Sequence, residues 1–243
     1  MVKRFPVFEC PTQVWNDDGA THKCGNTHGF IYKSGVYTQI DGPSAQNGTQ
    51  VLGINNSGQL SLSYTDSIFN KAYRWTPDGV GGYTKESLSL ASFGTFAQGI
   101  NNNGDVVGFY QTPNYGGFLW RSNGSTSTFN EPNDLLTTQA IGINDNGLIV
   151  GAAYNTSQIA GYLLKNGTFS VLNPPGSTYT YTTGINNNGT IVGWYFGATG
   201  NTHGFILSET NTPEPASAGM LVAGCLGMIW RMTRRRSGLK VAS

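Results

Sequence analysis

The sequence predicts an all-β fold built from repeats of about 44 residues, and two spacings and a bias in composition support this. A Gly-Ile-Asn turn recurs four times, with spacings of 46, 43 and 42 residues between Ile54, Ile100, Ile143 and Ile185. An aromatic residue after Gly or Ala recurs five times, with spacings of 43, 45, 44 and 43 between Phe30, Tyr73, Phe118, Tyr162 and Phe205. Glycine makes up 34 of the 243 residues, about twice its usual share, and charged residues only 11%. Many turns and few long helices are expected.

Residues 1–24 form an N-terminal segment before the first repeat. The segment starts with basic residues, as a signal peptide does, but no apolar run of about 7 to 15 residues follows. Because the C-terminal tail predicts export, we expect that the true start lies upstream or that the export route is unusual. Cys10 and Cys24 either pair in an exported protein or remain two buried thiols, and the third cysteine is Cys225.

Residues 25–208 form the repeat domain, in which each period is interpreted as two β-hairpins. The first hairpin turns at Asn-x-x-Gly, as in residues 101–104, where the last residue needs the positive φ that glycine adopts freely. The second turns at residues 33–35, 77–79, 122–124 and 165–167. Short apolar strands follow the first turn, and the glycines within them predict a bulge or a close approach between neighbouring repeats, at Gly108, Gly151 and Gly193.

Four short strands per period is the unit size of a β-propeller blade. The heptapeptide of residues 25–31 returns unchanged at 200–206, so a closed ring of four blades would place both copies in one slot. We therefore expect five blades, with residues 204–208 pairing with strands from the segment before Gly25, such as 7–8 and 13–15. The alternatives are an open array, a longer propeller whose first blades are missing, and, third, a β-solenoid.

The repeat resembles the HAF-type extracellular repeat family, in which Gly-Ile-Asn-x-x-Gly-x-Val-Val-Gly is followed by His-Ala-Phe. Here the triplet reads His-Gly-Phe at residues 28–30 and 203–205, and the three repeats between them lack the histidine. The resemblance covers nearly all of residues 25–207. It implies an extracellular repeat architecture and no particular activity.

The C-terminal part joins a linker, residues 209–215, to an apolar run, residues 216–230, and a basic tail, residues 231–243. A helix of 15 residues is roughly 22 Å long, short of the hydrocarbon core of about 30 Å, and snorkelling arginines with local thinning cover the difference. The positive-inside tendency predicts a transmembrane helix with its tail in the cytoplasm and the body outside.

This tail resembles the PEP-CTERM sorting signal, in which a Pro-Glu-Pro box precedes a short membrane helix and a basic cluster. In that family exosortase, a membrane-embedded cysteine transpeptidase, cuts near the box and passes the body to the cell surface or exopolysaccharide matrix. The resemblance implies recognition roles, without catalysis, for Pro213, Glu214, Pro215, Arg231, Arg234, Arg235 and Arg236. It also implies an exosortase-type transpeptidase, the membrane and exopolysaccharide as partners. An ordinary C-terminal anchor is the alternative.

The sequence before the C-terminal tail contains few patterns that are typical of catalysis or of nucleic-acid binding. Up to Thr212 the chain has nine basic and twelve acidic residues, since five of the 14 Lys and Arg follow residue 230 and one of the 13 acidic residues is Glu214. This balance gives no electrostatic footprint for nucleic acid. No Gly-x-Ser-x-Gly, zinc or phosphate-binding motif occurs, and the carboxylates occupy different points of the repeat, unlike the pair of a glycoside hydrolase. We expect no enzymatic activity, no metal and no cofactor.

Two repeated features have ligand-binding alternatives. His28 and His203 are candidate metal ligands, but a bond to a backbone carbonyl is favoured, and for residues 144–147 turn chemistry is favoured over a calcium loop. Aromatic residues follow the Gly-Ile-Asn hairpins, and their rings either pack between blades, the favoured interpretation, or contact a glycan: Tyr64, Tyr110, Trp194 and Tyr195.

The sequence as a whole predicts an exported, non-enzymatic repeat protein that is anchored in the inner membrane before processing and destined for the cell surface or matrix. A glycan-binding β-propeller module is the first alternative, and a propeller glycoside hydrolase is the second.

Overall fold

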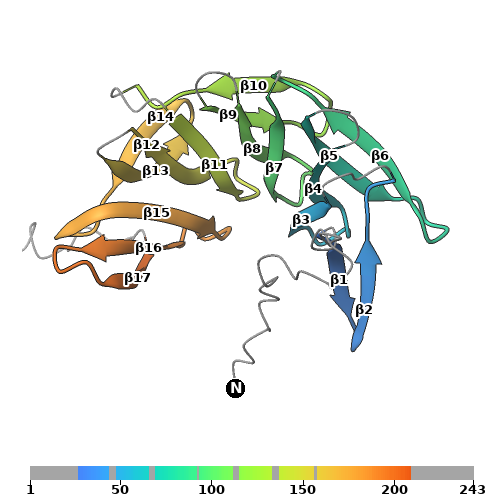
Figure 1. Cartoon of the computed structure of the whole chain (residues 1–243), viewed down its shortest axis with the longest axis horizontal. Coiled ribbons are helices and arrows are strands. Elements are labelled where there is room, and N and C mark those ends of the chain that lie inside the picture. Colours follow the sequence, from blue (N-terminus) through green and yellow to red (C-terminus); the bar gives the residue numbers. More distant parts are fainter. Residues whose placement is uncertain are drawn as a thin grey trace, which may run out of the picture. The chain divides into compact units, whose positions relative to one another are not determined.

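The computed structural model describes residues 27–43, 48–65, 69–91, 93–111, 115–132, 137–155 and 158–208, in which every regular element is a β-strand (Figure 1). The chain divides into two compact units, Met1–Leu207 and Ser208–Ser243, and all 17 strands of the described ranges lie in the first unit. The predicted closing strands 7–8 and 13–15, the linker, the membrane helix 216–230 and the basic tail lie outside the described residues.

Two four-stranded antiparallel sheets and the four-stranded antiparallel part of a seven-stranded sheet follow one another along the chain, and we call each of these units a blade. Blade 1 contains β3 (Thr49–Ile54), β4 (Leu60–Thr65), β5 (Asn70–Pro77) and β6 (Tyr83–Leu88). Blade 2 contains β7 (Thr95–Ile100), β8 (Val106–Gln111), β9 (Tyr115–Trp120) and β10 (Thr126–Phe129). Blade 3 contains β11 (Thr137–Ile143), β12 (Ile149–Tyr154), β13 (Ile159–Lys165) and β14 (Thr168–Leu172). The predicted all-β fold with four short strands per period is confirmed.

Two shorter sheets stand at the ends of this series. The N-terminal hairpin consists of β1 (Gly29–Lys33) and β2 (Val36–Ile40). Blade 4 has three strands, β15 (Ser177–Ile185), β16 (Ile191–Gly197) and β17 (Thr202–Leu207), and one parallel bridge, between Ile159 and Tyr179, joins it to blade 3. The two copies of the repeated heptapeptide therefore contribute to different sheets, because β1 pairs with β2 and β17 pairs with β16.

The turns follow the sequence prediction closely. The Gly-Ile-Asn turns end in glycines with φ of 75°, 81°, 75° and 78°, at Gly58, Gly104, Gly147 and Gly189. In each, the glycine N–H donates to the carbonyl oxygen of the first asparagine, for example Gly104 to Asn101 at 3.1 Å. A type I turn followed by a left-handed residue is the expected geometry for this sequence.

The predicted close approach at Gly108, Gly151 and Gly193 exists, but it is made within a blade. A Cβ on Gly108 would lie 1.9 Å from the carbonyl oxygen of Phe96 on the paired strand β7 and 2.8 Å from the Phe118 ring. The alternative of an approach between neighbouring repeats is therefore wrong for these glycines. The bulge alternative is borne out in the paired strand, where the register shifts directly after Ala97, the partner of Gly108. The strand partner and the aromatic side chain of the same blade already fill the space where a Cβ would stand.

Backbones of neighbouring blades instead approach at the glycine of Gly-Ile-Asn. A Cβ on Gly99 of blade 2 would lie 2.8 Å from the Ile141 carbonyl oxygen and 3.3 Å from Gly142 Cα, both in blade 3. A bulge in the first strand of each blade precedes this glycine, as the register shift between Ala97 and Gly99 shows. The bulge and the missing side chain together let the first strands of successive blades come close.

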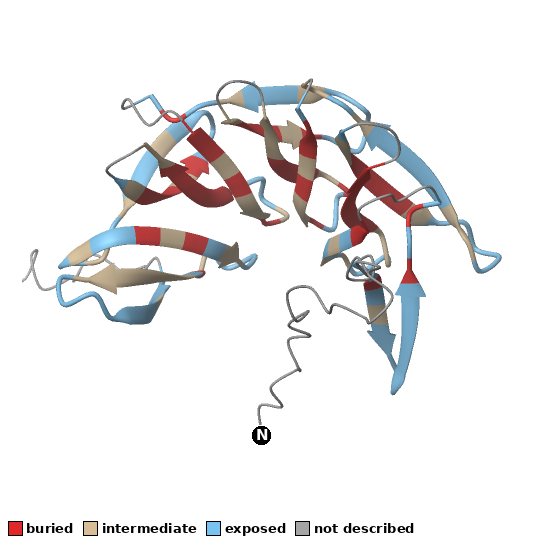
Figure 2. Cartoon of the chain, viewed as in Figure 1, coloured by how far each residue is buried: buried red, intermediate tan, exposed pale blue. Residues whose placement is uncertain are grey.

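The hydrophobic core lies between neighbouring blades. Val107 of β8 belongs to a cluster with Ile149 and Tyr162 of blade 3, and Ala72 of β5 belongs to one with Phe118 of blade 2. The aromatic residue of the second repeat marker is buried in all three complete blades, with 4%, 0% and 1% exposure for Tyr73, Phe118 and Tyr162. Figure 2 shows these buried positions along the middle strands, while β1, β2 and β6 are mostly exposed.

Candidate functional site

The four Gly-Ile-Asn turns form the most regular polar structure of the described residues, and we call it the asparagine ladder, with rungs at residues 55–58, 101–104, 144–147 and 186–189. The first asparagine of each rung holds its own turn. Asn101 Oδ1 accepts the backbone N–H groups of Asn103 and Asp105 at 3.1 and 2.9 Å. The same pair of bonds recurs at Asn55, Asn144 and Asn186.

The same asparagine also reaches the next rung. Asn55 Nδ2 donates to the Asn101 carbonyl oxygen at 2.9 Å, and Asn101 Nδ2 donates to that of Asn144 at 3.1 Å. Asn144 Nδ2 continues the series to Asn186 at 3.0 Å. The asparagine side chain has a carbonyl oxygen that accepts from its own turn and an NH2 group that donates to the next rung. An ionised aspartate has no donor, and a serine has only one hydroxyl for both tasks. The ladder therefore explains why the turn begins with asparagine.

A second line of bonds runs one residue further along each rung. Backbone N–H groups donate to side-chain oxygens of the next rung, from Asn56 to Asn102, from Asn102 to Asp145 and from Asp145 to Asn187. Asp145 Oδ2 also accepts the Nδ2 groups of Asn102 and Asn187, at 2.8 and 2.7 Å. The hydrogen bonds from Asn102 are the largest cause that holds the pKa of Asp145 below its ordinary value, against a smaller effect of desolvation.

The carboxylate at the candidate calcium loop, residues 144–147, is thus fully engaged by amide donors. Both oxygens of Asp145 accept hydrogen bonds within the ladder. Among the described residues, no group of three or more His, Cys, Asp and Glu side chains lies together as a metal site. The favoured interpretation of residues 144–147 as turn chemistry fits this geometry.

Of the four candidate glycan contacts, the three tyrosines occupy equivalent positions. Tyr64 is only 3% exposed and stacks on Tyr73 with 4.0 Å between ring centroids, so its ring faces protein and not solvent. Tyr110 is half-buried and packs against the core between blades 1 and 2. Tyr195 is half-buried beside His203, with ring centroids 5.3 Å apart. Their shared position is a packing position.

Trp194 lies on the opposite face of β16, because successive side chains of a strand alternate. It stacks on Tyr181 at 4.3 Å, and Phe196 lies edge-on to it at 5.5 Å. Tyr179 extends this group, 6.1 Å from Phe196. We call these four residues the blade 4 aromatic group. Trp194 and Tyr195 are neighbours in the sequence, but strand alternation places their side chains on opposite faces, so the prediction that groups them does not reveal this group.

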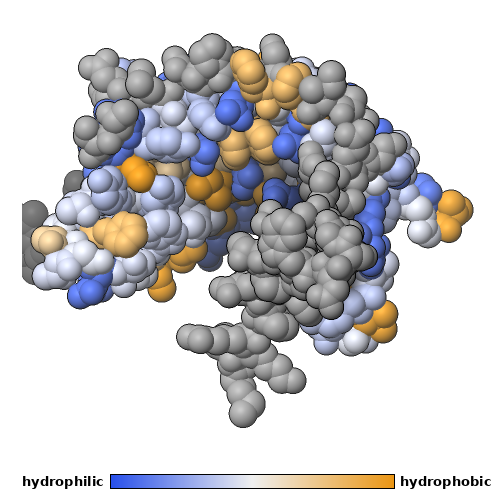
Figure 3. All heavy atoms as spheres, in the orientation of Figure 1, coloured by the Kyte–Doolittle hydropathy of each residue, from blue (hydrophilic) through white to orange (hydrophobic). Residues whose placement is uncertain are grey.

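Apolar side chains elsewhere on the surface are dispersed. On the face visible in Figure 3 they form small groups among hydrophilic side chains. Outside blade 4, the exposed aromatic residues of the described ranges include Phe30, Tyr32 and Tyr37 of the N-terminal hairpin.

His28 belongs to a polar cluster on the N-terminal hairpin. Its Nδ1 lies 2.9 Å from Asp41 Oδ1, and Gln39 Nε2 donates to the other oxygen of Asp41. Desolvation raises the pKa of Asp41, but hydrogen bonds from Gln39 and His28 and the charge of His28 together hold it below its ordinary value. The favoured bond of His28 to a backbone carbonyl is therefore wrong. The second histidine, His203, is exposed next to Tyr195.

Arg74 on β5 is a buried cation that the sequence analysis missed. Its side chain is 2% exposed and its Nε donates to Glu86 at 2.8 Å. Nη1 donates to the carbonyl oxygens of Gly104 and Arg121 in blade 2, at 2.9 and 3.1 Å, and the guanidinium lies 4.5 Å from the Trp120 ring centroid. The side chain therefore ties blade 1 to two turns of blade 2.

Other carboxylates of the described ranges also accept hydrogen bonds from turns, one carboxylate at each turn. Asp78 accepts the N–H groups of Val80 and Gly82, and Asp105 accepts that of Ser122. These contacts use the carboxylates locally, one by one, where a hydrolase would bring a pair together.

The predicted sorting residues 213–215, 231 and 234–236 lie outside the described residues. Within the described ranges, no helix has the length and apolar character needed to cross a membrane.

Comparison with known proteins gives a likeness in structure. No family model matches the chain, and no curated protein matches it in sequence. Among solved structures, a streptogramin B lyase is similar at 14% sequence identity with a TM-score of 0.47, over 79% of this chain and 67% of that one.

Proposed function

We propose that this protein is an exported, non-enzymatic repeat protein whose C-terminal PEP-CTERM-type signal directs it to the cell surface or exopolysaccharide matrix. The observation that carries the proposal is the order of three features: the Pro-Glu-Pro box at 213–215, the apolar run at 216–230 and the arginines that follow it. A membrane-embedded transpeptidase can bind the box only if the apolar run holds it at the non-cytoplasmic surface of the inner membrane. The arginines, which stay in the cytoplasm, fix that orientation.

The body supports a structural role for the repeats. The resemblance to the HAF-type extracellular repeat family agrees with an exported location. The distinctive side chains of the repeat are used to join blades: the asparagines form the ladder, and Arg74 bridges two blades. Such a body presents a rigid surface outside the cell, which suits a matrix component.

The test is to express the full-length chain in a host that has an exosortase and in its exosortase deletion strain. We expect the host to remove the residues after the box and to release the body outward, and the deletion strain to keep the full mass in the inner membrane. Intact mass spectrometry of membrane and outer fractions measures both.

Two variants separate recognition from anchoring. Replacing Pro213, Glu214 and Pro215 by alanine should block cleavage while the chain stays in the membrane. Replacing Arg234, Arg235 and Arg236 by glutamine, which removes the charge at similar size, should disturb orientation. Identical masses and locations in both strains would withdraw the sorting proposal and leave an ordinary anchor.

A second candidate function is glycan binding, and the blade 4 aromatic group favours it. Trp194 and Tyr181 present stacked, half-buried rings, and Tyr179 is 37% exposed. Flat aromatic faces suit the apolar faces of sugar rings.

Binding to the exopolysaccharide of the producing cell, measured by co-sedimentation, tests this function. We expect Trp194→Ala to reduce binding at least tenfold. Tyr37→Ala, which removes an exposed aromatic ring from the N-terminal hairpin, is the matched control and should leave binding unchanged. Equal retention of the wild type and Trp194→Ala would eliminate glycan binding through this group.

A further inference from the structure

Blade 4 presents its aromatic group on one face of a three-stranded sheet. Residues that pair across antiparallel strands share a face, and every second residue of a strand returns to it. Trp194 of β16 pairs with Tyr181 of β15 and with Gly204 of β17. The pairs on either side of this row complete nine positions, which we call the blade 4 face: Tyr179, Tyr181, Gly184, Val192, Trp194, Phe196, Thr202, Gly204 and Ile206.

The opposite face of this sheet packs on blade 3. Thr180 and Thr182 are both 0% exposed, and Thr182 Oγ1 donates to the Gly151 carbonyl oxygen of β12. A Cβ on Gly161 of β13 would lie 2.9 Å from the Thr182 side chain and 3.0 Å from that of Thr180. The blade 4 face therefore points away from blade 3.

The blade 4 face is accessible to a ligand. Ile206 and Tyr179, at opposite corners of the face, are 74% and 37% exposed, and Trp194 between them is half-buried. Gly204 is exposed, and a Cβ built there would meet only the Gly193 carbonyl oxygen, at 3.9 Å. The flank of Trp194 that faces β17 therefore has room for a ligand.

The blade 4 face carries no charged side chain. The sequence has no Lys, Arg, Asp or Glu between Lys165 and Glu209, a stretch that contains all three strands of blade 4. His203 is the titratable imidazole of this stretch, and it pairs with Tyr195, so its side chain lies on the opposite face. By comparison, β5 and β6 of blade 1 contain two lysines, an arginine and a glutamate. A ligand on the blade 4 face therefore meets aromatic rings and hydroxyl groups without a formal charge.

This combination of groups suits an uncharged sugar chain. The apolar face of a sugar ring packs on a flat aromatic side chain such as that of Trp194. The hydroxyls of Thr202, Tyr179 and Tyr181 can donate to and accept from sugar hydroxyls. Burial raises the pKa of the Tyr181 phenol, which therefore stays protonated and able to donate. An acidic sugar would lose part of the hydration of its carboxylate on these rings without gaining a cationic partner from the face.

The size of the face argues against a second copy of the chain as its occupant. Adjacent strands lie about 4.8 Å apart and alternate residues about 6.8 Å apart, so the nine positions cover about 300 Å². A stable interface between two proteins buries about 800 Å² on each partner. The blade 4 face is too small for such an interface and accommodates a few sugar units.

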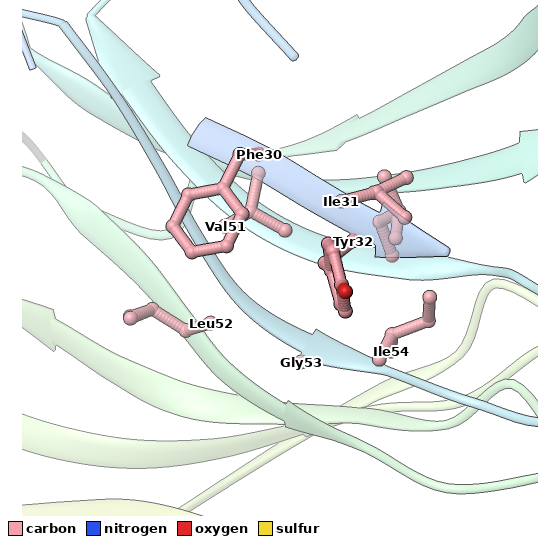
Figure 4. Close-up of a pocket in the computed structure, with 8 residues that line it drawn as sticks. Phe30, Ile31, Tyr32, Val51, Leu52, Gly53 and Ile54 are labelled. Atoms are coloured by element: carbon pink, nitrogen blue, oxygen red, sulfur yellow. The ribbon is translucent and has the colours of Figure 1, made fainter. Parts of the chain in front are cut away.

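A cleft in the N-terminal part of the described chain offers a different chemistry. It has a volume of about 190 Å³, and its lining includes Phe30 and Tyr32 of β1 and Leu52 and Ile54 of β3 (Figure 4). Of its eight lining residues, Tyr32 alone has a polar side-chain atom. A site that orients a sugar needs several placed polar groups, so the blade 4 face suits this ligand better.

We propose that the blade 4 face binds an uncharged polysaccharide, whose sugar rings pack on Trp194 and the aromatic residues beside it. The proposal rests on glycan binding, the second candidate function, and adds the class of glycan and the surface that holds it. Because no ion pair forms between this face and its ligand, the affinity depends little on the salt concentration.

The test measures binding of the full-length chain, in a non-ionic detergent, to immobilised polysaccharides at about 50 mM and about 500 mM NaCl. Dextran, laminarin and galactomannan are the uncharged probes, and alginate is the anionic one. We expect an uncharged probe to bind with less than a twofold change in affinity between the two salt concentrations, and alginate to bind at least tenfold more weakly. Trp194→Ala should weaken binding at least tenfold, whereas Tyr32→Ala, which removes a ring from the cleft, should leave it unchanged.

A further variant adds a charge to the face and keeps every aromatic ring. Thr202→Lys places a cation next to Phe196, the partner of Thr202 in the register. We expect this variant to bind alginate at low salt and to lose at least tenfold of that affinity at high salt. Thr168→Lys, which adds the same charge to an exposed threonine of β14, is the matched control and should not bind alginate.

The other outcomes separate this proposal from the function on which it rests. Binding of alginate alone, lost in Trp194→Ala, would keep glycan binding and overturn the uncharged class. Binding of an uncharged probe that is lost in Tyr32→Ala but not in Trp194→Ala would move the site to the cleft. A wild-type dimer that Trp194→Ala converts to a monomer, measured by light scattering, would identify a second copy as the occupant. Absence of binding to all four probes would overturn both glycan binding and this proposal.

Discussion

Equivalent residues of the interior blades and of the two end sheets have the same chemistry but very different burial. The repeat aromatic is at most 4% exposed in blades 1 to 3 and 57% exposed at Phe30 of the N-terminal hairpin. Two residues further along the strand, exposure is 3%, 4% and 7% at Trp75, Trp120 and Leu164, but 58% and 42% at Tyr32 and Leu207. The difference shows that the neighbouring blade, and not the residue itself, creates the core of this protein.

Repeat proteins stack units that bury little surface alone, so their stability is a sum of unit and interface contributions. The interfaces here combine apolar contacts with the asparagine ladder and the Arg74 bridge. Substitutions of residues that join neighbouring blades should therefore cost more than the same substitutions of residues that do not, and the first three predictions below test this difference.

The largest effect is expected for Arg74→Ala at the interface of blades 1 and 2. The substitution removes the side-chain donor of the Gly104 carbonyl oxygen, one of the two donors to the Arg121 carbonyl oxygen, and the stacking on Trp120. We expect the free energy of unfolding to fall by about 3–5 kcal/mol, measured by urea denaturation. Arg121→Ala, which removes an exposed bond to Ser127, is the control and should change it by less than about 0.5 kcal/mol. Equal losses for the two variants would contradict a stabilising role of Arg74 between blades 1 and 2.

Asn144→Ala should follow. Asn144 is 2% exposed, and its side chain accepts from Asn146 and Leu148 and donates to Asn186. We expect a loss of about 2–3 kcal/mol, because three partly buried hydrogen bonds to backbone groups are lost. The same substitution at Asn123, whose side chain serves one exposed turn, should cost about 1 kcal/mol or less. Equal losses for Asn144→Ala and Asn123→Ala would mean that the hydrogen bonds between rungs do not stabilise the protein.

A smaller loss of stability is expected at the glycine of Gly-Ile-Asn, where two equivalent glycines can be compared directly. Gly99→Ala should lower the free energy of unfolding by about 1–3 kcal/mol, since its Cβ would press on the blade 3 backbone. Gly184→Ala meets only Val192 among the described residues. Gly184→Ala should therefore cost clearly less than Gly99→Ala. Equal costs at the two sites would contradict the role of this glycine in the close approach of neighbouring blades.

The smallest effect is expected in the pH dependence of stability. The pKa of Asp145 is lowered in the folded state, so the stability that its hydrogen bonds contribute is present above the ordinary aspartate pKa and is lost as the pH falls through the folded value. We expect Asp145→Asn to be somewhat less stable than the wild type at neutral pH and to lose less stability on acidification. Thermal unfolding between about pH 6 and pH 2 measures this. Parallel profiles for the two proteins would contradict the assignment.

Much of the local structure was predictable from the sequence because turn chemistry is local. Gly104 and its equivalents adopt the expected positive φ, and the hairpins lie where the two repeat markers place them. Contacts between blades were not predictable in the same way. The bond from Asn101 to Asn144 joins residues 43 apart, and a period reveals equivalent positions but not which side chains of two units meet.

The same limit explains the errors at particular residues. Gly108 carries a signal for close approach, but the sequence does not say whether the approaching atoms belong to its own blade or the next. Tyr64 and Trp194 both follow a Gly-Ile-Asn hairpin, yet they lie on opposite faces of their strands, one buried and one half-buried. The role of Arg74 was not predictable, because the sequence around a single basic residue on a strand does not show that carbonyl oxygens of the next blade lie beside it.

Amide hydrogen exchange at the second residue of the rungs tests most directly whether the asparagine ladder joins neighbouring blades. The amides of Asn102 and Asp145 donate to the next rung and should exchange slowly. The account predicts that Asn144→Ala accelerates exchange at both amides at least tenfold, whereas Asn123→Ala leaves both unchanged. Fast exchange at Asn102 and Asp145 in the unaltered protein would contradict a ladder that joins neighbouring blades.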